Sequence, residues 1–387
     1  MTTTVRADAS YRLLHGASYA GLFIVGVYAA AFGPALDFVA DGTGVSLDTA
    51  GLMLTAFFAG SISASAVVAV WLHGRDSRLV AAGGLALVAA GSATIAASQG
   101  FGGVLAGSVV LGLGDGLIVA ALHILIAATS DDVPHGINQL NLYFAVGAVA
   151  GPLWAGAVLA TTGSYELVYA GIGAVTLAAL ASMLVARSPA GHAGDLPDES
   201  RAFHLSPTTL VMGAVLFLYV GAEFGLGSWV STYARETADA GVFGAALLAA
   251  GYWAALMFGR LASGAYFRRA GDASVLLLAS VAGAGISSLA LALASGNLAL
   301  SALSAFGAGF CMGPVWPCVV AIAAEAGESS STASTVTMGN SGGVVIPWLQ
   351  GRILVNSGPS QGVFVTAVLS AAMFGITFVF RARRVAI

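Results

Sequence analysis

The sequence predicts an all-α membrane protein with twelve transmembrane helices arranged as two six-helix halves. Hydrophobic residues make up 58% of the 387 residues and charged residues only 8%, whereas a soluble domain carries about 25% charged residues. The mean hydropathy is +0.91. Apolar runs recur almost from end to end, and a run of about 20 residues can cross roughly 30 Å of hydrocarbon as a helix. A lipid bilayer is therefore the expected solvent of the chain.

Apolar runs separated by polar loops give the expected helices and their order. The helices are expected at 13–38, 47–72, 79–98, 103–128, 136–160, 165–187, 207–233, 241–266, 273–294, 297–324, 333–355 and 361–382. The most polar long stretch follows the sixth helix and divides the chain near its middle. We therefore expect an N-terminal six-helix half at 1–187, a cytoplasmic linker at 188–206 and a C-terminal six-helix half at 207–387.

The arginines predict the orientation in the membrane. All 14 basic residues are Arg, and most of them fall on one side of the twelve-helix arrangement, which the positive-inside rule assigns to the cytoplasm. The opposite loops hold mainly acids, such as Asp41, Asp48 and Glu166. Both termini are therefore expected in the cytoplasm. A composition rich in Gly and Arg but without Lys favours a bacterial inner membrane.

Several classes of protein are excluded by what the sequence lacks. Without Lys there is no Walker A loop, and a net charge of −4 without a basic stripe argues against a nucleic-acid partner. Cys311 and Cys318 lie in one apolar run and are expected to be packing residues. The six histidines are scattered, and the chain contains neither HExxH nor GxSxG. No metal, no cofactor and no enzymatic activity are therefore expected.

An internal repeat relates the two expected halves. Gly147, Pro152, Gly156 and Gly163 recur at the same spacings in the fifth helix of the second half. The counterparts are Gly342, Pro347, Gly351 and Gly358. Glycine allows close helix contact and proline allows a local bend. Two halves repeated in parallel are typical of transporters that alternate access to a site between them.

The sequence resembles the fucose:proton symporter group of the major facilitator superfamily, to which sodium-linked glucose carriers are related. The resemblance is carried by Gly112, Gly114 and Gly116, by 138–144 with Gly147, Gly151 and Pro152, by 219–223 with Trp229 and Tyr233, and by Gly259, Arg260, Trp316, Pro317, Gly342, Gly343 and Pro347. It implies the major facilitator fold, a central polar cavity, ion-driven uptake of a sugar and, by the default of the superfamily, a monomer.

The sequence departs from that group at two acidic positions. Proton-coupled members carry one acid late in helix one and one in helix four, where this chain has 29–31, all Ala, and 117–119, which reads Leu-Ile-Val. The coupling ion is therefore left open between H+ and Na+.

Two other acids lie within the expected hydrocarbon, Asp115 in helix four and Glu223 in helix seven. A charge there costs about 2.5–3.5 kcal/mol on insertion scales, so an intramembrane acid is a functional candidate. Asp115 lies on the helix face that the family's acid would use, and His123 lies further toward the cytoplasm. We expect these three residues to take part in coupling or protonation, with a structural hydrogen bond as the alternative for Asp115 and His123.

Amides and aromatic rings are the candidates for binding the solute. Asn138 and Asn141 share one helical face and offer paired donors and acceptors for hydroxyl groups, and Asn340 of helix eleven could do the same across the cavity. Rings that could stack on a sugar are those of Tyr143, Tyr219, Trp229 and Trp316. The alternative for the rings is anchoring at the membrane interface.

Charges near the cytoplasmic helix ends are candidates for a gate. Arg75, Asp76 and Arg78 form a short loop after helix two, and Arg260 lies toward the end of helix eight. In the superfamily such loops resemble a cytoplasmic gate whose charges pair when the transporter is open outward. Topology signals would explain the arginines equally well.

The leading hypothesis is a symporter that takes up a sugar or polyol with H+ or Na+. Efflux of drugs or metabolites by proton antiport is the first alternative, suggested by the glycines and proline of 147–156. A third alternative, a non-transporting sensor or a membrane enzyme, lacks an output domain and a catalytic cluster. The expected partners are a small solute, the coupling ion and the lipid bilayer.

Overall fold

The computed structural model describes residues 9–71, 75–187, 206–269, 271–325 and 329–385, and these residues are helical almost throughout. Seven helices precede the division of the chain: α1 (Ala9–Thr43), α2 (Leu47–Ala50), α3 (Leu52–Trp71), α4 (Ser77–Ala97), α5 (Phe101–Thr129), α6 (Val133–Thr162) and α7 (Tyr165–Val185). Seven follow it: α8 (Pro207–Ala238), α9 (Val242–Phe267), α10 (Ala273–Leu293), α11 (Leu298–Met312), α12 (Val315–Ala324), α13 (Ser329–Ser357) and α14 (Pro359–Val385).

The expected fold class is confirmed, because the described residues contain helices and turns and no strand. Within the described ranges, eleven segments are long and apolar enough to cross a bilayer. The remaining expected span is α13, whose 29 residues are long enough but begin with a run of Ser and Thr. Two expected helices are interrupted. The second divides into α2 and α3 at Gly51, and the tenth divides into α11 and α12 at Gly313 and Pro314.

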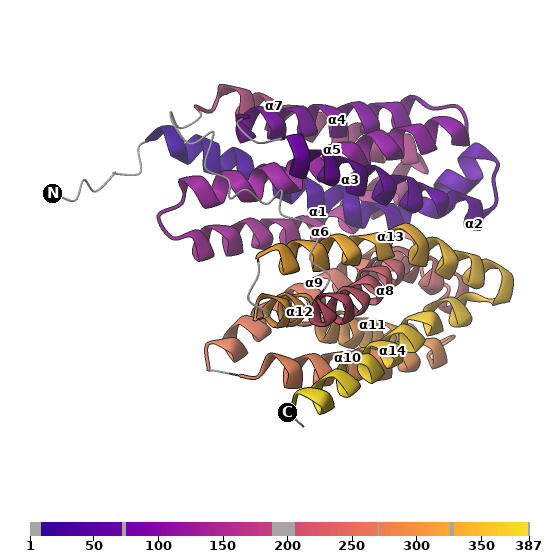
Figure 1. Ribbon diagram of the computed structural model, residues 1–387. Helices are drawn as coiled ribbons and strands as arrows, with labels where there is room; N and C mark the ends of the chain where they lie inside the picture. The colour runs from indigo at the N-terminus through magenta and orange to yellow at the C-terminus, as the bar shows by residue number, and fades with distance from the viewer. Residues whose placement is uncertain (1–8, 72–74, 188–205, 270, 326–328, 386–387) are drawn as a thin grey trace.

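Two groups of helices lie one above the other, α1–α7 and α8–α14 (Figure 1). The groups meet through α1, α2, α3 and α6 on one side and α8, α9 and α13 on the other. Most of the expected linker, residues 188–205, lies outside the described residues. We call the end of the bundle at which α1 begins and α14 ends the terminal end, and the opposite end the far end.

The first glycine of the repeat packs in the same way in both groups. A Cβ atom on Gly147 of α6 would overlap the backbone oxygen of Phe23 in α1, and a Cβ atom on Gly342 of α13 would overlap the backbone oxygen of Phe217 in α8. Only glycine allows these two backbones to approach so closely. The first position of the sequence repeat therefore corresponds to a repeated helix contact, whereas Gly156 packs on Ala246 of the other group and Gly351 on Trp229 of its own group.

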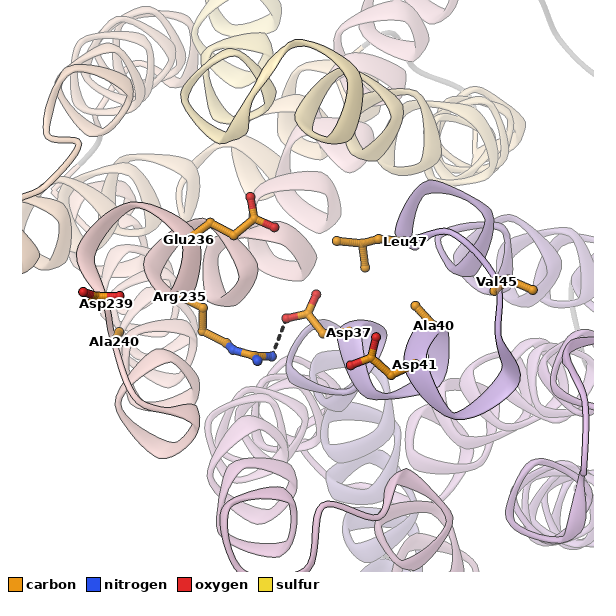
Figure 2. Close-up of a pocket in the computed structure, with 9 residues that line it drawn as sticks. All are labelled: Asp37, Ala40, Asp41, Val45, Leu47, Arg235, Glu236, Asp239 and Ala240. Carbon is orange, nitrogen blue, oxygen red and sulfur yellow. Dashed lines mark hydrogen bonds and ion pairs between the residues drawn. The ribbon is translucent and has the colours of Figure 1, made fainter.

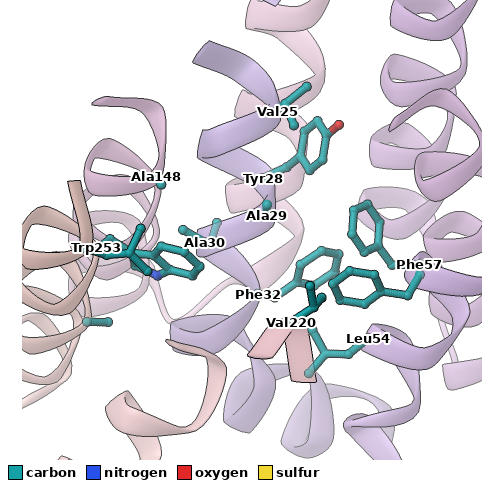
Figure 3. Packing of buried hydrophobic residues seen from close by; sticks show 14 of the residues in the cluster. Val25, Tyr28, Ala29, Ala30, Phe32, Leu54, Phe57, Ala148, Val220 and Trp253 are labelled. Carbon is teal, nitrogen blue, oxygen red and sulfur yellow. The ribbon is translucent and has the colours of Figure 1, made fainter. Parts of the chain in front are cut away.

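Aromatic side chains pack from one group into the other near the middle of the bundle. Phe57 of α3 contacts Phe58 with ring centroids 5.2 Å apart, and Phe58 contacts Phe224 of α8 at 4.9 Å. Phe224 in turn contacts Trp253 of α9 at 5.6 Å. Figure 3 shows the buried side chains around this run, including Ala30. The alanines of 29–31 are buried packing residues.

The polar and aromatic side-chain contacts that join the two groups lie between the middle and the far end. In the described part of the chain they are Asp37 with Thr232 and Arg235, Asp48 with Arg352, Thr55 with Val344, Phe38 with Arg235, and Phe58 with Phe224. Backbone contacts follow the same distribution, since Gly33 packs on Ser228 and Gly156 packs on Ala246. The two groups are therefore held together at the far end.

Candidate functional site

Asp115 lies near the middle of α5 and is held by two hydroxyl groups from other helices. Tyr28 of α1 donates a hydrogen bond to Oδ1 at 2.7 Å, and Ser61 of α3 donates one to Oδ2 at 2.6 Å. Asp115 is 9% exposed and Tyr28 is fully buried. No basic side chain among the described residues forms an ion pair with Asp115. The carboxyl group therefore lies in the bundle with hydroxyl partners and without a described cation beside it.

Glu223 lies near the middle of α8 and forms an ion pair with Arg260 of α9. The Oε1 atom is 2.9 Å from Nη2 of Arg260, and the side chains are 4% and 27% exposed, respectively. The Tyr252 hydroxyl donates to the backbone oxygen of Glu223 at 2.9 Å. The expectation that Arg260 belongs to a gate with 75–78 is not tested, but its observed partner is Glu223.

The guanidinium of Arg260 has N–H donors that form no hydrogen bond to a described residue. Besides the ion pair, Nη2 donates to the hydroxyl of Tyr219 at 3.4 Å. Nε is buried without a hydrogen-bond partner, and Nη1 donates to no described residue. The ring of Tyr219 contacts that of Trp316 in α12, with centroids 6.5 Å apart. Tyr219 and Trp316 therefore form a wall beside Arg260.

His123 does not contact Asp115. The two residues are about 12 Å apart along α5 at 1.5 Å per residue. The Nδ1 atom of His123 lies 2.7 Å from the backbone oxygen of Val119, and the imidazole also interacts with the side chain of Asn141 in α6. The structure therefore places His123 with the solute-binding candidates rather than with the carboxylate.

Asn138 and Asn141 are exposed on the face of α6 that points toward the other group of helices. Further along α6, Gly156 packs against Ala246 of α9. Asn138 is about five whole turns from Gly156 and therefore lies on the same face of α6. Asn141 points within about 60° of that face. Both amides are exposed. They therefore lie where the facing helices of the two groups have parted, toward the terminal end.

The aromatic candidates and Asn340 occupy different surroundings. Tyr143 stacks on Tyr19 of α1 with centroids 5.0 Å apart. Trp229 is fully buried toward the far end, where Nε1 donates to the backbone oxygen of Pro347 at 2.7 Å. Trp316 and Asn340 are half-buried in the terminal half of α12 and α13. In this conformation Trp229 is a packing residue, whereas Trp316 and Asn340 keep partial exposure.

The charged loop after α3 fastens neighbouring helices. Asp76 caps α4 by accepting a hydrogen bond from the backbone nitrogen of Arg78 at 2.9 Å. Nη1 of Arg78 donates to the backbone oxygens of Leu184 and Ala186 at the end of α7, at 3.1 Å and 2.6 Å, where the helix dipole favours a cation. Arg75 is exposed. A gate role for these three residues stays a prediction.

An ion pair between the two groups was not predicted from the sequence. Asp37 of α1 accepts hydrogen bonds from Arg235 of α8 at 2.6 Å and from Thr232 at 3.1 Å. The pair borders a cavity of about 410 Å³ at the far end, also lined by Asp41, Glu236 and Asp239 (Figure 2). The sequence contained a signal for this ion pair, because an acid and an arginine lie near the far ends of the first helices of the two halves.

The arrangement of helices and the family comparison lead to one conclusion. A family model described as Major Facilitator Superfamily matches residues 19–347, most of the chain. The chain belongs to the Major Facilitator Superfamily. It is therefore a multi-pass membrane transporter for a small solute and not an enzyme.

Proteins similar to this major facilitator chain differ in their named solutes. The E. coli fucose:proton symporter FucP is 18% identical, with 95% of this chain and 98% of that chain covered and a TM-score of 0.63. A POT family transporter in complex with 5-aminolevulinic acid is 12% identical, with 96% of each chain covered and a TM-score of 0.79. These identities establish the fold alone.

Among curated proteins, the chain is similar to "Bypass of stop codon protein 6" of Saccharomyces cerevisiae. The two are 28% identical over 160 residues, which are 38% of this chain and 32% of the yeast protein. The match thus spans about a third of that relative.

Proposed function

We propose that this transporter is an ion-coupled symporter of a sugar or related polyol that works by alternating access. The observation that carries the proposal is Asp115, a carboxylate near the middle of a membrane helix with hydroxyl partners and no cation beside it. A charge in this position has a high cost in free energy, so an acid there is a candidate for a role in the transport cycle. A proton on Asp115 removes that charge, so H+ is the leading coupling ion and Na+ the alternative.

The solute is proposed to bind in the terminal half of the bundle. Asn138 and Asn141 present exposed amides on the face of α6 that points toward the other group. Amides donate and accept hydrogen bonds at once, which suits hydroxyl groups. Trp316 supplies a half-buried ring on the opposite side, and Tyr219, which is fully buried, lies against that ring. These side chains combine hydroxyl recognition with a surface for the apolar face of a sugar.

Alternating access requires the two groups of helices to part at one end at a time. The contacts between the groups lie between the middle and the far end, where Asp37 pairs with Arg235 and Asp48 with Arg352. With both termini in the cytoplasm, as the arginines predict, this arrangement is inward-facing. We further propose a bacterial inner membrane as the location and a monomer as the working unit.

The test is uptake into proteoliposomes under an imposed proton or sodium gradient, with radiolabelled hexoses and polyols. The wild type is expected to accumulate at least one of these solutes against its gradient. Asp115→Asn is expected to abolish accumulation while solute exchange without a gradient persists, because the amide cannot carry the proton. Glu166→Gln, a carboxyl-to-amide change at the start of α7, is the matched control and should accumulate like the wild type.

Three results would count against the proposal. Full accumulation by Asp115→Asn would remove Asp115 from coupling. Accumulation that follows only a sodium gradient would replace H+ by Na+. Proton-driven export of amphipathic compounds, with no uptake of sugars or polyols under either gradient, would replace symport by efflux.

A further inference from the structure

We propose that the solute carries a carboxylate beside its hydroxyl groups, as a sugar acid such as an aldonate or a uronate does, and that Arg260 binds this carboxylate. The inference rests on the proposed transport of a polyhydroxy solute and specifies its class. A neutral sugar needs no cation, because amides, hydroxyls and rings suffice for its recognition. A guanidinium in the membrane-spanning part of the bundle calls for anionic partners. Glu223 accepts from a single nitrogen of Arg260, which leaves other N–H donors for an anionic ligand.

Arg260 points toward the space between the two groups and not toward lipid. The exposed large apolar side chains of α9 are Phe243, Leu247, Phe258 and Leu261. At about 100° per residue, Arg260 is turned away from all four of these side chains by roughly 100–160°. It lies within about 40° of Ala246, the residue that packs on Gly156 of the other group. The 27% exposure of the Arg260 side chain is therefore exposure on the facing side.

Arg260 lies opposite the asparagines at the same depth. α6 and α9 run antiparallel and touch where Gly156 meets Ala246. From that contact toward the terminal end, Asn141 is about 22 Å away along α6 and Arg260 about 21 Å away along α9, at 1.5 Å per residue. One side of the site thus offers amides for hydroxyls, and the other offers a cation for a carboxylate.

The guanidinium can bind a second anion. It carries five N–H donors, and Oε1 of Glu223 accepts a hydrogen bond from only one of its nitrogens, Nη2, at 2.9 Å. Nη1 donates to no described residue. A carboxylate approaching the free side can form the charge-assisted hydrogen bonds that Arg forms best. Glu223 would hold the guanidinium in place while the site is empty.

Charge balance gives the proposal a second observable. Arg260 and Glu223 together are neutral, so a bound carboxylate adds one negative charge to the site. One proton carried on Asp115 compensates that charge. Cotransport of a monocarboxylate with one proton then moves no net charge, whereas cotransport of a neutral sugar with one proton moves one positive charge and responds to the membrane potential.

The experiment measures uptake of gluconate, glucuronate, glucose and sorbitol into proteoliposomes under a proton gradient, with and without an imposed membrane potential. Gluconate or glucuronate is expected to be preferred over sorbitol by about 100-fold in kcat/KM, and its uptake should not change with the potential. Arg260→Gln should lose that preference, and Arg260→Lys should keep only part of it because Lys lacks the planar fork. Arg269→Gln, at the terminal end beyond α9, is the matched control.

Folding of the variants is checked by the thermal midpoint in detergent and by its rise on addition of gluconate. The wild type and Arg269→Gln should show the rise, and Arg260→Gln should not. Uptake of glucose or sorbitol that no acid inhibits would overturn the carboxylate site while leaving symport of a polyol standing. Absence of uptake of all four compounds under proton and sodium gradients would overturn both proposals. Equal preference for gluconate in Arg260→Gln and wild type would also overturn the role of Arg260.

Discussion

Glu223 and Arg260 place two full charges among membrane helices, so the effect of each charge on the stability of the transporter depends on the other. Glu223 is 4% exposed and its oxygen lies 2.9 Å from the guanidinium. Removing one partner of a buried ion pair leaves an uncompensated charge, whereas removing both leaves none. The two residues should therefore behave as one unit in any stability measurement.

Glu223→Gln is expected to lower the stability of the transporter by about 3 kcal/mol, the lower end of the range for a broken buried pair because Arg260 keeps some exposure. Adding Arg260→Gln should recover most of that loss. The measurement is the thermal unfolding midpoint in detergent for wild type, both single variants and the double variant. Additive losses in the double variant would mean that the observed ion pair does not couple the two residues.

The sequence marks candidate residues where a charge within the membrane is costly, but it does not show which side chains of other helices they meet. Asp115 and Glu223 stand out as acids in apolar runs. The hydroxyl partners of Asp115, Tyr28 and Ser61, come from helices distant in the sequence and carry no local signal. The sequence also marks Arg260, near the cytoplasmic end of its helix, as a gate candidate. That role stays a prediction, and its observed partner Glu223 comes from the packing of α9 on α8.

At the scale of helices, the repeated contact between α6 and α1 and between α13 and α8 depends on glycine. Gly147 and Gly342 lie against backbone oxygens of Phe23 and Phe217, which cannot move aside as a flexible side chain can. An added methyl group must separate the two helices or shift them along each other.

Gly147→Ala and Gly342→Ala are each expected to destabilise the transporter by about 1–3 kcal/mol, the cost of overpacking a tight contact. Gly83→Ala is the control, because Gly83 lies inside α4 with no atom within 4 Å of an added Cβ. That change should be neutral or stabilising by up to about 1 kcal/mol through helix propensity. Thermal midpoints in detergent compare the three variants, and equal behaviour of all three would refute the close contact.

The positions of helices follow from hydropathy, but their interruptions and ends do not. Expected and observed spans agree within a few residues for α4, α7, α9 and α10. The break between α11 and α12 at Gly313 and Pro314 lies inside a continuous apolar run, so hydropathy does not mark it. α8 continues to Ala238 rather than ending at 233, because a helix can extend beyond the apolar layer through polar residues such as Arg235.

At the scale of the whole molecule, the far end is held by contacts between the two groups while the exposed asparagines lie toward the terminal end. Two ion pairs contribute to the closure, Asp37 with Arg235 at 2.6 Å and Asp48 with Arg352 at 3.8 Å. Their side chains are 18–52% exposed, so each is worth only about 1 kcal/mol. A bias of that size is enough to shift a two-state equilibrium about fivefold.

Asp37→Asn should therefore weaken closure of the far end and lower the population of the observed conformation. The readout is alkylation of a cysteine introduced by Asn138→Cys, in a background where Cys311 and Cys318 are replaced by Ser, because position 138 faces the space between the groups. We expect labelling from the terminal side to slow in the Asp37→Asn variant, by at most about fivefold and by less if the observed conformation is strongly populated. Asp131→Cys, exposed in the loop before α6, is the control and should label at an unchanged rate. Unchanged or faster labelling at position 138 would mean that the ion pair does not favour this conformation.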